Sequence, residues 1–237
     1  MKKRTIKDRL LALFFPKRCA GCDCIIGLDE YACKECMGRI RLLDGPTCMV
    51  CGKSVKESEV FCYDCSRKNH AFIQNTAVFV YSDVRESLYR FKYSGRAEYA
   101  KYYAKKAYEQ YAQKISCWNA DAIVPIPLHR SRYRKRGYNQ AEEFAKELSV
   151  LTGIPVVNRV LFRVKNTKPS KLLSVSERQN NLKKAFIFMQ NDVKLNTIIL
   201  VDDIYTTGAT LDAAAKVCAE GGVARIYTMT IAVGRGF

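Results

Sequence analysis

Eight cysteines in the first 65 residues form four C-x-x-C pairs, and the pattern C-x2-C-x10-C-x2-C is written twice, 29 residues apart. Four thiolates are the ligand set of a closed tetrahedral zinc site, and the short x2 spacing directs two sulfurs at one ion. We therefore expect two structural Zn²⁺ ions, one per repeat unit, although a nested pairing of the motifs is the alternative. The predicted ligands are Cys19, Cys22, Cys33 and Cys36 in the first unit and Cys48, Cys51, Cys62 and Cys65 in the second.

A segment of only about fifty residues buries little core, so a bound metal must supply folding energy. Disulfides and a redox-active C-x-x-C are the alternatives, but a cytoplasmic location disfavours the first and four pairs are too many for the second. We expect a cytoplasmic protein because the apolar run at residues 10–15 is shorter than the core of a signal peptide. No window has the roughly 18 apolar residues that span a bilayer. Cys24 lies outside the repeat and is predicted to be a spare thiol.

From about residue 76 onward, strand patterns alternate with helix patterns, which is typical of α/β proteins with a mostly parallel sheet. Strands are expected at residues 77–81, 121–127, 156–164, 197–201 and 224–233. Helices are expected at residues 84–93, 97–115, 139–152, 176–183 and 209–220, and a loop at 165–175. The sequence thus predicts an N-terminal helix and double zinc ribbon at residues 1–70, followed by an α/β domain at residues 71–237.

The segment IILVDDIYTTGAT at residues 198–210 places two carboxylates and a hydroxyl-rich turn after a buried strand. Ligands of parallel sheets bind beyond the carboxyl ends of the strands. Free N–H groups at the start of the next helix favour a phosphate, and Gly208 lets the backbone approach it closely. Asp202 and Asp203 would repel a phosphate, so we expect them to accept hydrogen bonds from sugar hydroxyls, with Mg²⁺ as a further candidate. Capping of the strand by Asp and of the helix by Thr would explain each residue but not their order. The order therefore predicts a sugar-phosphate site.

This segment resembles the 5-phosphoribosyl-1-pyrophosphate (PRPP) signature of type I phosphoribosyltransferases. The resemblance implies a sheet of type I phosphoribosyltransferase type, with Asp202 and Asp203 on the ribose hydroxyls and Mg²⁺ bound with PRPP. The loop implied to bind the 5′-phosphate consists of Thr206, Thr207, Gly208, Ala209 and Thr210. The loop implied to bind pyrophosphate contains Leu128, His129 and Arg130.

Three further segments, together with the cysteine module, are similar to the ComF family of competence proteins, in particular to its ComFC-type members. These segments are RFKYSGR at 90–96, PIPLHRSRYRKRGYNQ at 125–140 and ERQNNLKKAF at 177–186. The likeness covers nearly the whole chain. It implies a role in importing single-stranded DNA during natural transformation, with a competence helicase as a candidate partner and no stable membrane span.

The balance of 40 Lys and Arg against 23 Asp and Glu gives a formal net charge of +17, which favours a polyanionic partner. The cations after His129 exceed what one pyrophosphate can use, and neighbouring tyrosines could stack on bases. The predicted contacts to single-stranded DNA are Arg132, Tyr133, Arg134, Lys135, Arg136, Arg163, Lys165, Lys168 and Lys171. Arg90, Lys92 and Arg96 could extend this track, and a solvated charged surface is the alternative.

Two functions stay open on this basis. The first is a DNA-handling protein that uses a PRPP-type pocket for binding or regulation. The second is an active phosphoribosyltransferase that transfers ribose 5-phosphate from PRPP to a nucleobase-like acceptor. The zinc module and the surplus positive charge favour the first function, because an enzyme acting on a small base needs neither, whereas the acidic pair and its loop favour the second.

Overall fold

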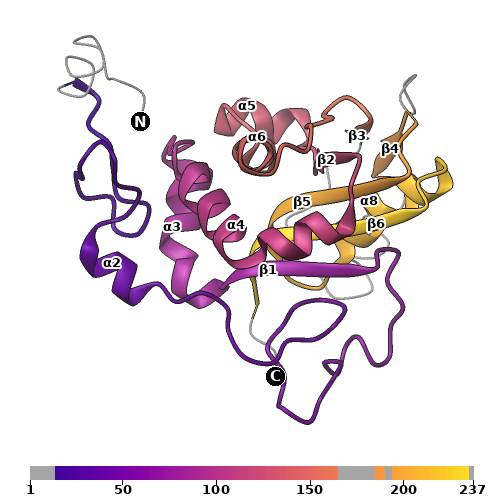
Figure 1. The fold of residues 1–237 in the computed structure, drawn as a ribbon. Coiled ribbons are helices and arrows are strands. Elements are labelled where there is room, and N and C mark those ends of the chain that lie inside the picture. Colours follow the sequence, from indigo (N-terminus) through magenta and orange to yellow (C-terminus); the bar gives the residue numbers. More distant parts are fainter. Residues whose placement is uncertain (1–13, 165–184, 190–193, 235–237) are drawn as a thin grey trace.

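The computed structural model describes residues 14–164, 185–189 and 194–234 of the chain (Figure 1). Several features predicted from the sequence lie outside these residues. They are the N-terminal helix, the loop at 165–175, the helix near 176–183, and the candidate DNA contacts Lys165, Lys168 and Lys171.

Four parallel strands form the central sheet, in the order β1-β6-β5-β2. Their bounds are Gln74–Val80 for β1, Ala122–Pro125 for β2, Thr197–Tyr205 for β5 and Arg225–Val233 for β6. These strands are apolar along most of their length because helices or zinc units cover both faces of the sheet. The predicted α/β fold with a mostly parallel sheet is therefore confirmed.

The two faces of the sheet carry different elements (Figure 1). Among the elements that the structure describes, three helices cover the face to which Ile199 and Val201 of β5 point, and one covers the face to which Ile198 and Leu200 point. The three helices are α3 (Tyr81–Tyr93), α4 (Tyr99–Trp118) and α6 (Gln140–Thr152), and the single helix is α8 (Ala209–Glu220). The first cysteine unit, with the short helix α2 (Lys34–Arg39), packs with the three helices, and the second unit packs with α8. The two zinc units therefore lie on opposite faces of one sheet.

Several predicted elements differ from those in the structure. The strand expected at 156–164 is wrong over most of its length, because Val156 makes a single parallel bridge to Ile123 and only Leu161–Arg163 forms a strand, β3. This short strand pairs antiparallel with β4, Phe186–Phe188. The strand expected to end at residue 201 continues through the acidic pair to Tyr205, because β5 keeps its ladder with β6 as far as Val233.

The basic segment after residue 129 forms a helix, α5 (Arg130–Arg136), where the sequence predicts a pyrophosphate loop and a track of cations. His129 caps its start by accepting a hydrogen bond from the N–H of Ser131, and Gly137 ends it at a φ of 81°. This conformation favours glycine because a Cβ there is strained. Arg130 is therefore the first residue of a helix and does not belong to a loop. The division of the chain at residue 70 stays a prediction.

No helix within the described ranges is both long enough and apolar enough to cross a bilayer.

Candidate functional site

The eight repeat cysteines form two clusters, and each cluster takes all four members from one repeat unit. Within each cluster the sulfur atoms lie within 4.8 Å of one another, so a single metal ion can contact all four. Backbone N–H groups of Gly21 and Cys33 donate to the Cys19 sulfur over 3.3 and 3.2 Å. The sequential arrangement predicted from the repeat is the one found, and the donor set fits structural Zn²⁺.

The first unit is joined to the helices of its face by charged groups. Arg96 makes two hydrogen bonds to the carboxylate of Asp23, at 2.7 and 2.9 Å, and the Tyr99 hydroxyl donates to the same carboxylate. Arg90 donates to the carbonyl of Gly21. Both arginines were candidates for a DNA track, and in the structure both hold the zinc ribbon against the helices α3 and α4.

The second unit is joined to the sheet by a buried polar network. The Asn75 side chain donates to the Cys51 carbonyl over 2.9 Å and accepts from the Thr228 hydroxyl over 2.8 Å. Gly52 has a φ of 73°, and a Cβ at this position would lie 3.0 Å from the Asn75 carbonyl oxygen. The turn that carries Cys51 therefore lies directly against β1.

Asp202 and Asp203 lie in the last part of β5, at the edge of the sheet where α8 begins. The backbone N–H of Asp203 donates to the Asp202 carboxylate over 2.8 Å. The ammonium group of Lys92, from the last turn of α3, lies 2.9 Å from the Asp203 carboxylate. Lys92 and Asp203 are 16% and 17% exposed, so the ion pair is largely shielded from water.

Two arginines add positive charge beside the acidic pair. Burial, with repulsion from Arg132, lowers the pKa of Arg163 to about 10, while Asp202 opposes this change. Burial and Arg136 lower the pKa of Arg132, while Asp203 and Asp202 oppose it. Burial and then Asp203 raise the pKa of Asp202 to about 7, against the effect of Lys92 and Arg163. The carboxylates therefore lie in a half-buried group of mixed charge, to which α3, α5 and β3 each contribute a cation.

The threonine loop runs from the end of β5 into α8. Gly208 is buried at a φ of 73°, and a Cβ there would overlap the hydroxyl of Tyr205. Gly208 stands at the N-cap of α8 and has no side chain that could accept a hydrogen bond from the first N–H groups of the helix. Thr206 is exposed, whereas Thr207, Ala209 and Thr210 are half-buried. This arrangement leaves the first-turn N–H groups available to an anion.

Helix α5 divides its cations between two faces. Arg132 and Arg136 are half-buried, and Arg136 donates to Gln140 over 2.8 Å while its guanidinium lies 5.0 Å from the centre of the Tyr93 ring. Tyr133, which follows Arg132 in α5, is 50% exposed. The other outward side chains are Arg130, Arg134 and Lys135. The structure thus places Arg132 near the acidic residues, Arg136 against Gln140 and Tyr93, and the outward residues on the protein surface.

The remaining predicted residues within the described ranges can also be placed. Leu128 and His129 are half-buried, between the end of β2 at Pro125 and the start of α5. Arg163, predicted as a DNA contact, lies beside Asp202 and packs on the Phe186 ring. The sequence missed the pairing of Lys92 with Asp203, although RFKYSGR had drawn attention to Lys92 as a charged residue.

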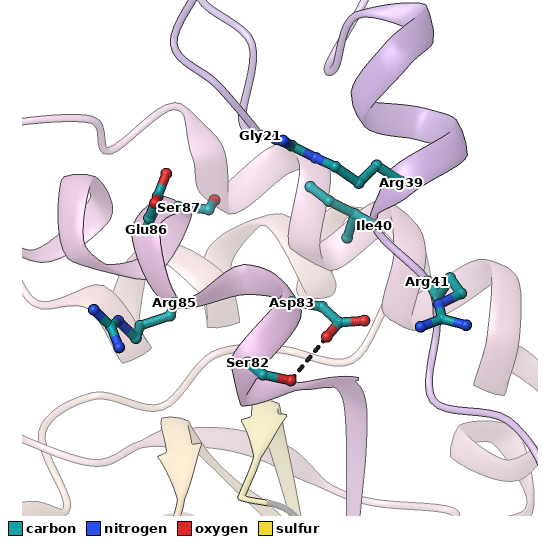
Figure 2. A pocket seen from close by; sticks show the side chains of 9 residues that line it. All are labelled: Gly21, Arg39, Ile40, Arg41, Ser82, Asp83, Arg85, Glu86 and Ser87. Carbon is teal, nitrogen blue, oxygen red and sulfur yellow. Dashed lines mark hydrogen bonds between the residues drawn. The ribbon is translucent and has the colours of Figure 1, made fainter.

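A hollow of about 490 Å³ lies elsewhere, between the first zinc unit and the start of α3 (Figure 2). Three arginines line it, together with Asp83, which accepts a hydrogen bond from Ser82, and Glu86 (Figure 2). The arginines are Arg39, Arg41 and Arg85. Because carboxylates stand among the guanidinium groups, the lining indicates no single class of ligand.

The sequence matches two domain families in the order that the structure suggests. Residues 10–66 match the double zinc ribbon domain, and residues 100–236 match the phosphoribosyl transferase domain. The protein is therefore a phosphoribosyl transferase-domain protein preceded by a double zinc ribbon.

Relatives that match most of the chain, across both domains, define the family more closely. The chain is 33% identical to competence protein ComFC of Bacillus subtilis, over 83% of this chain and 81% of the relative. It is 29% identical to competence protein F of Haemophilus influenzae, over 92% and 98% respectively. It is also 26% identical to DNA utilization protein YhgH of Escherichia coli, over 90% and 96%. The chain belongs to the ComF family of competence proteins.

Proposed function

We propose that this protein handles single-stranded DNA during competence and binds PRPP, with Mg²⁺, at its acidic pair. The names of the relatives, which refer to competence and to DNA utilization, support a role in competence. The main support for binding both PRPP and DNA is the division of α5 into an inward and an outward cationic face. Each face offers positive charge to a different anionic ligand, so two such ligands can bind next to each other. A cytoplasmic site of action and a competence helicase as partner belong to the same proposal.

In this proposal Asp202 and Asp203 accept hydrogen bonds from the ribose hydroxyls, and the loop at residues 206–210 binds the 5′-phosphate. The segment at residues 128–130 contacts the pyrophosphate. Arg132 and Arg163 are half-buried near the acidic pair, and their charge offsets the repulsion between PRPP and two carboxylates. We therefore assign Arg163 to the PRPP pocket and not to the DNA track.

The DNA would lie along the outward face of α5. Arg130, Arg134 and Lys135 are exposed and can bind phosphates, and Tyr133 presents a ring on which a base can stack. Such contacts depend little on base sequence because every nucleotide offers a phosphate and a flat ring.

Replacing Arg134 and Lys135 with glutamine should weaken DNA binding and flatten its dependence on salt. Each phosphate contact on a single strand contributes a slope of about −0.7 to the plot of log K against log salt concentration, so losing two should reduce the slope by about 1.4. Fluorescence anisotropy with a labelled oligonucleotide over a range of salt concentrations measures this slope.

The matched control replaces Arg132 and Arg136 with glutamine, which removes the same charge from the same helix. We expect this variant to keep the wild-type salt slope and to lose PRPP affinity. Equal slopes for the wild type and the Arg134/Lys135 variant would contradict the DNA assignment. A wild type that does not bind single-stranded DNA even at low salt would end the DNA-handling proposal.

The raised pKa of Asp202 should make PRPP binding depend on pH. A ribose hydroxyl donates to the carboxylate, so the protonated form, which predominates below about pH 7, should bind less well. Affinity should therefore rise by about tenfold between roughly pH 6 and pH 8, as expected when only the ionised form binds. Asp202→Asn should flatten the profile, apart from a contribution from the ligand phosphate, whose second pKa is about 6. Calorimetric titrations at several pH values measure the profile, and an unchanged slope in the variant would contradict this role.

Active phosphoribosyl transfer is the second candidate, and the joint placement of the acidic pair and the threonine loop at the end of β5 favours it. The protein incubated with Mg²⁺ and PRPP, with and without single-stranded DNA, provides the test. Continuous release of pyrophosphate with a nucleobase acceptor would favour the enzyme. Binding of PRPP without turnover would favour a ligand that regulates DNA handling.

A further inference from the structure

His70 joins the second cysteine unit to the first turn of α8. Its ring lies with Nε2 3.5 Å from the Cys65 sulfur and Nδ1 2.9 Å from the Asp212 carboxylate. The His70 side chain is only 2% exposed, so both contacts are shielded from water. One buried ring therefore links a predicted zinc ligand to the helix that follows the threonine loop.

Two neighbours of His70 bind the same carboxylate. Lys68 forms an ion pair with Asp212, and the backbone N–H of Ala71 donates to it over 3.2 Å. The backbone N–H of Asp212 in turn donates to the Gly208 carbonyl over 2.8 Å. The segment after the second cysteine unit thus holds α8 at the point where the threonine loop enters it.

A second line of contacts runs through aromatic rings. The His70 ring stacks on Phe72 with centroids 4.8 Å apart, and Phe72 meets Tyr205 edge-on with centroids 6.4 Å apart. The Tyr205 hydroxyl fills the space that a Cβ at Gly208 would need. His70 is therefore connected to both ends of the threonine loop. It is connected through Phe72 to Tyr205, which precedes the loop, and it contacts Asp212, which follows the loop.

The first cysteine unit provides an internal comparison. The residue 29 positions before His70 is Arg41, so the first unit has no histidine at the equivalent place. Its polar contacts go instead to α3 and α4, through Asp23 and Arg96 among others. The connection to the threonine loop is thus a property of the second unit.

We propose that His70 is a positioning residue that holds the phosphate-binding loop against the second zinc ribbon, so that zinc at that ribbon and ribose phosphate at the loop strengthen each other's binding. The inference rests on the proposed PRPP site. A hydrogen-bond partner of a metal ligand fixes that ligand's orientation, and here the same side chain fixes Asp212. Coupling of this kind is reciprocal, because each ligand favours the same arrangement of the loop.

The test replaces His70 with alanine in the full chain. All eight cysteines remain, so the variant should still contain two zinc ions. Amide hydrogen exchange in residues 206–212 should become faster, and calorimetry should show PRPP with Mg²⁺ binding about tenfold or more weakly, since a hydrogen bond to a charged group is lost. A purely structural link between the ribbon and the domain would alter the melting temperature without changing PRPP affinity.

Two conservative variants separate the contacts of the ring. In His70→Asn the amide nitrogen stands near the position of Nδ1 and can donate to Asp212, so most of the affinity should return. In His70→Gln the amide reaches toward Cys65 instead, and the affinity should stay low. Equal behaviour of these two variants would overturn the inference.

Asp212→Asn is a further variant, and it lies outside both cysteine units. It should reproduce the loss of His70→Ala, and the double variant should bind no worse than either single one. Additive losses, or wild-type affinity and exchange in His70→Ala, would overturn the inference. A wild type that does not bind PRPP would refute the proposed function instead, and the exchange measurement would still decide whether His70 positions the loop.

Discussion

Replacing Cys51 with serine should destabilise the whole protein, whereas the same change at Cys22 should loosen only the first ribbon. The two cysteines occupy equivalent places in the repeat, but Cys51 is 1% exposed and Cys22 is exposed. Cys51 also belongs to the core beneath α8, and its carbonyl accepts from Asn75. A structural zinc site in finger peptides contributes about 10–16 kcal/mol apparent, so losing part of it should lower the free energy of unfolding by several kcal/mol.

Metal analysis and denaturant unfolding measure the two effects. The wild type should contain two zinc ions and each variant fewer, with the lower unfolding midpoint for Cys51→Ser. Cys117→Ser is the control, because Cys117 is exposed and lies outside both clusters. Wild-type protein purified without chelator and free of zinc would show that the units do not hold metal. Equal destabilisation by the two cluster variants would contradict their unequal packing.

The grouping of the cysteines could be predicted because it depends on local spacing. An x2 turn brings two sulfurs together, and an x10 connection returns the chain to the same ion. The order of strand, acidic pair, threonine turn and helix is equally local, so the sequence placed Asp202, Asp203 and the loop at one sheet edge. The strand order β1-β6-β5-β2 was not predicted, because it joins segments that are distant in the chain.

The helical state of residues 130–136 was hidden by their charge. A run of cations repels itself, and without partners it is expected to stay extended and solvated. Here Arg132 lies near Asp202 and Asp203, and Arg136 contacts Gln140 and Tyr93. Since most of these partners come from other elements, the sequence alone could not tell inward cations from outward ones.

The pairing of His70 with Asp212 shows the same limit, because 142 residues separate them. The sequence around His70 carries no motif that points to either of its partners. Its two partners belong to different parts of the protein and meet only because the second zinc unit packs on the face of the sheet that α8 covers. Long-range contacts of this kind carry no local pattern.

Replacing Asp202 and Asp203 together with asparagine should weaken PRPP binding by two orders of magnitude or more. Each carboxylate is proposed to accept a charge-assisted hydrogen bond from the ribose, and losing such a bond costs about 1.5–3 kcal/mol. Because about 1.4 kcal/mol corresponds to a tenfold change in affinity, two bonds give about a hundredfold or more. Calorimetry with PRPP and Mg²⁺ measures the loss, and unchanged affinity in a folded double variant would refute the ribose assignment.

A structural alternative is that Asp203 only forms the ion pair with Lys92 and does not contact the ligand. Substitution of Lys92 tests this alternative. In that case Lys92→Met and Asp203→Asn should lose similar stability, since either change leaves one charge without its neutralising partner in a shielded position. PRPP affinity would then be unaffected by Asp203→Asn in the Lys92→Met background. If Asp203 binds the ribose, the same substitution should still reduce affinity by about tenfold or more in that background. The comparison therefore separates the ion pair from the ligand contact, because the Lys92→Met background removes the first and keeps the second.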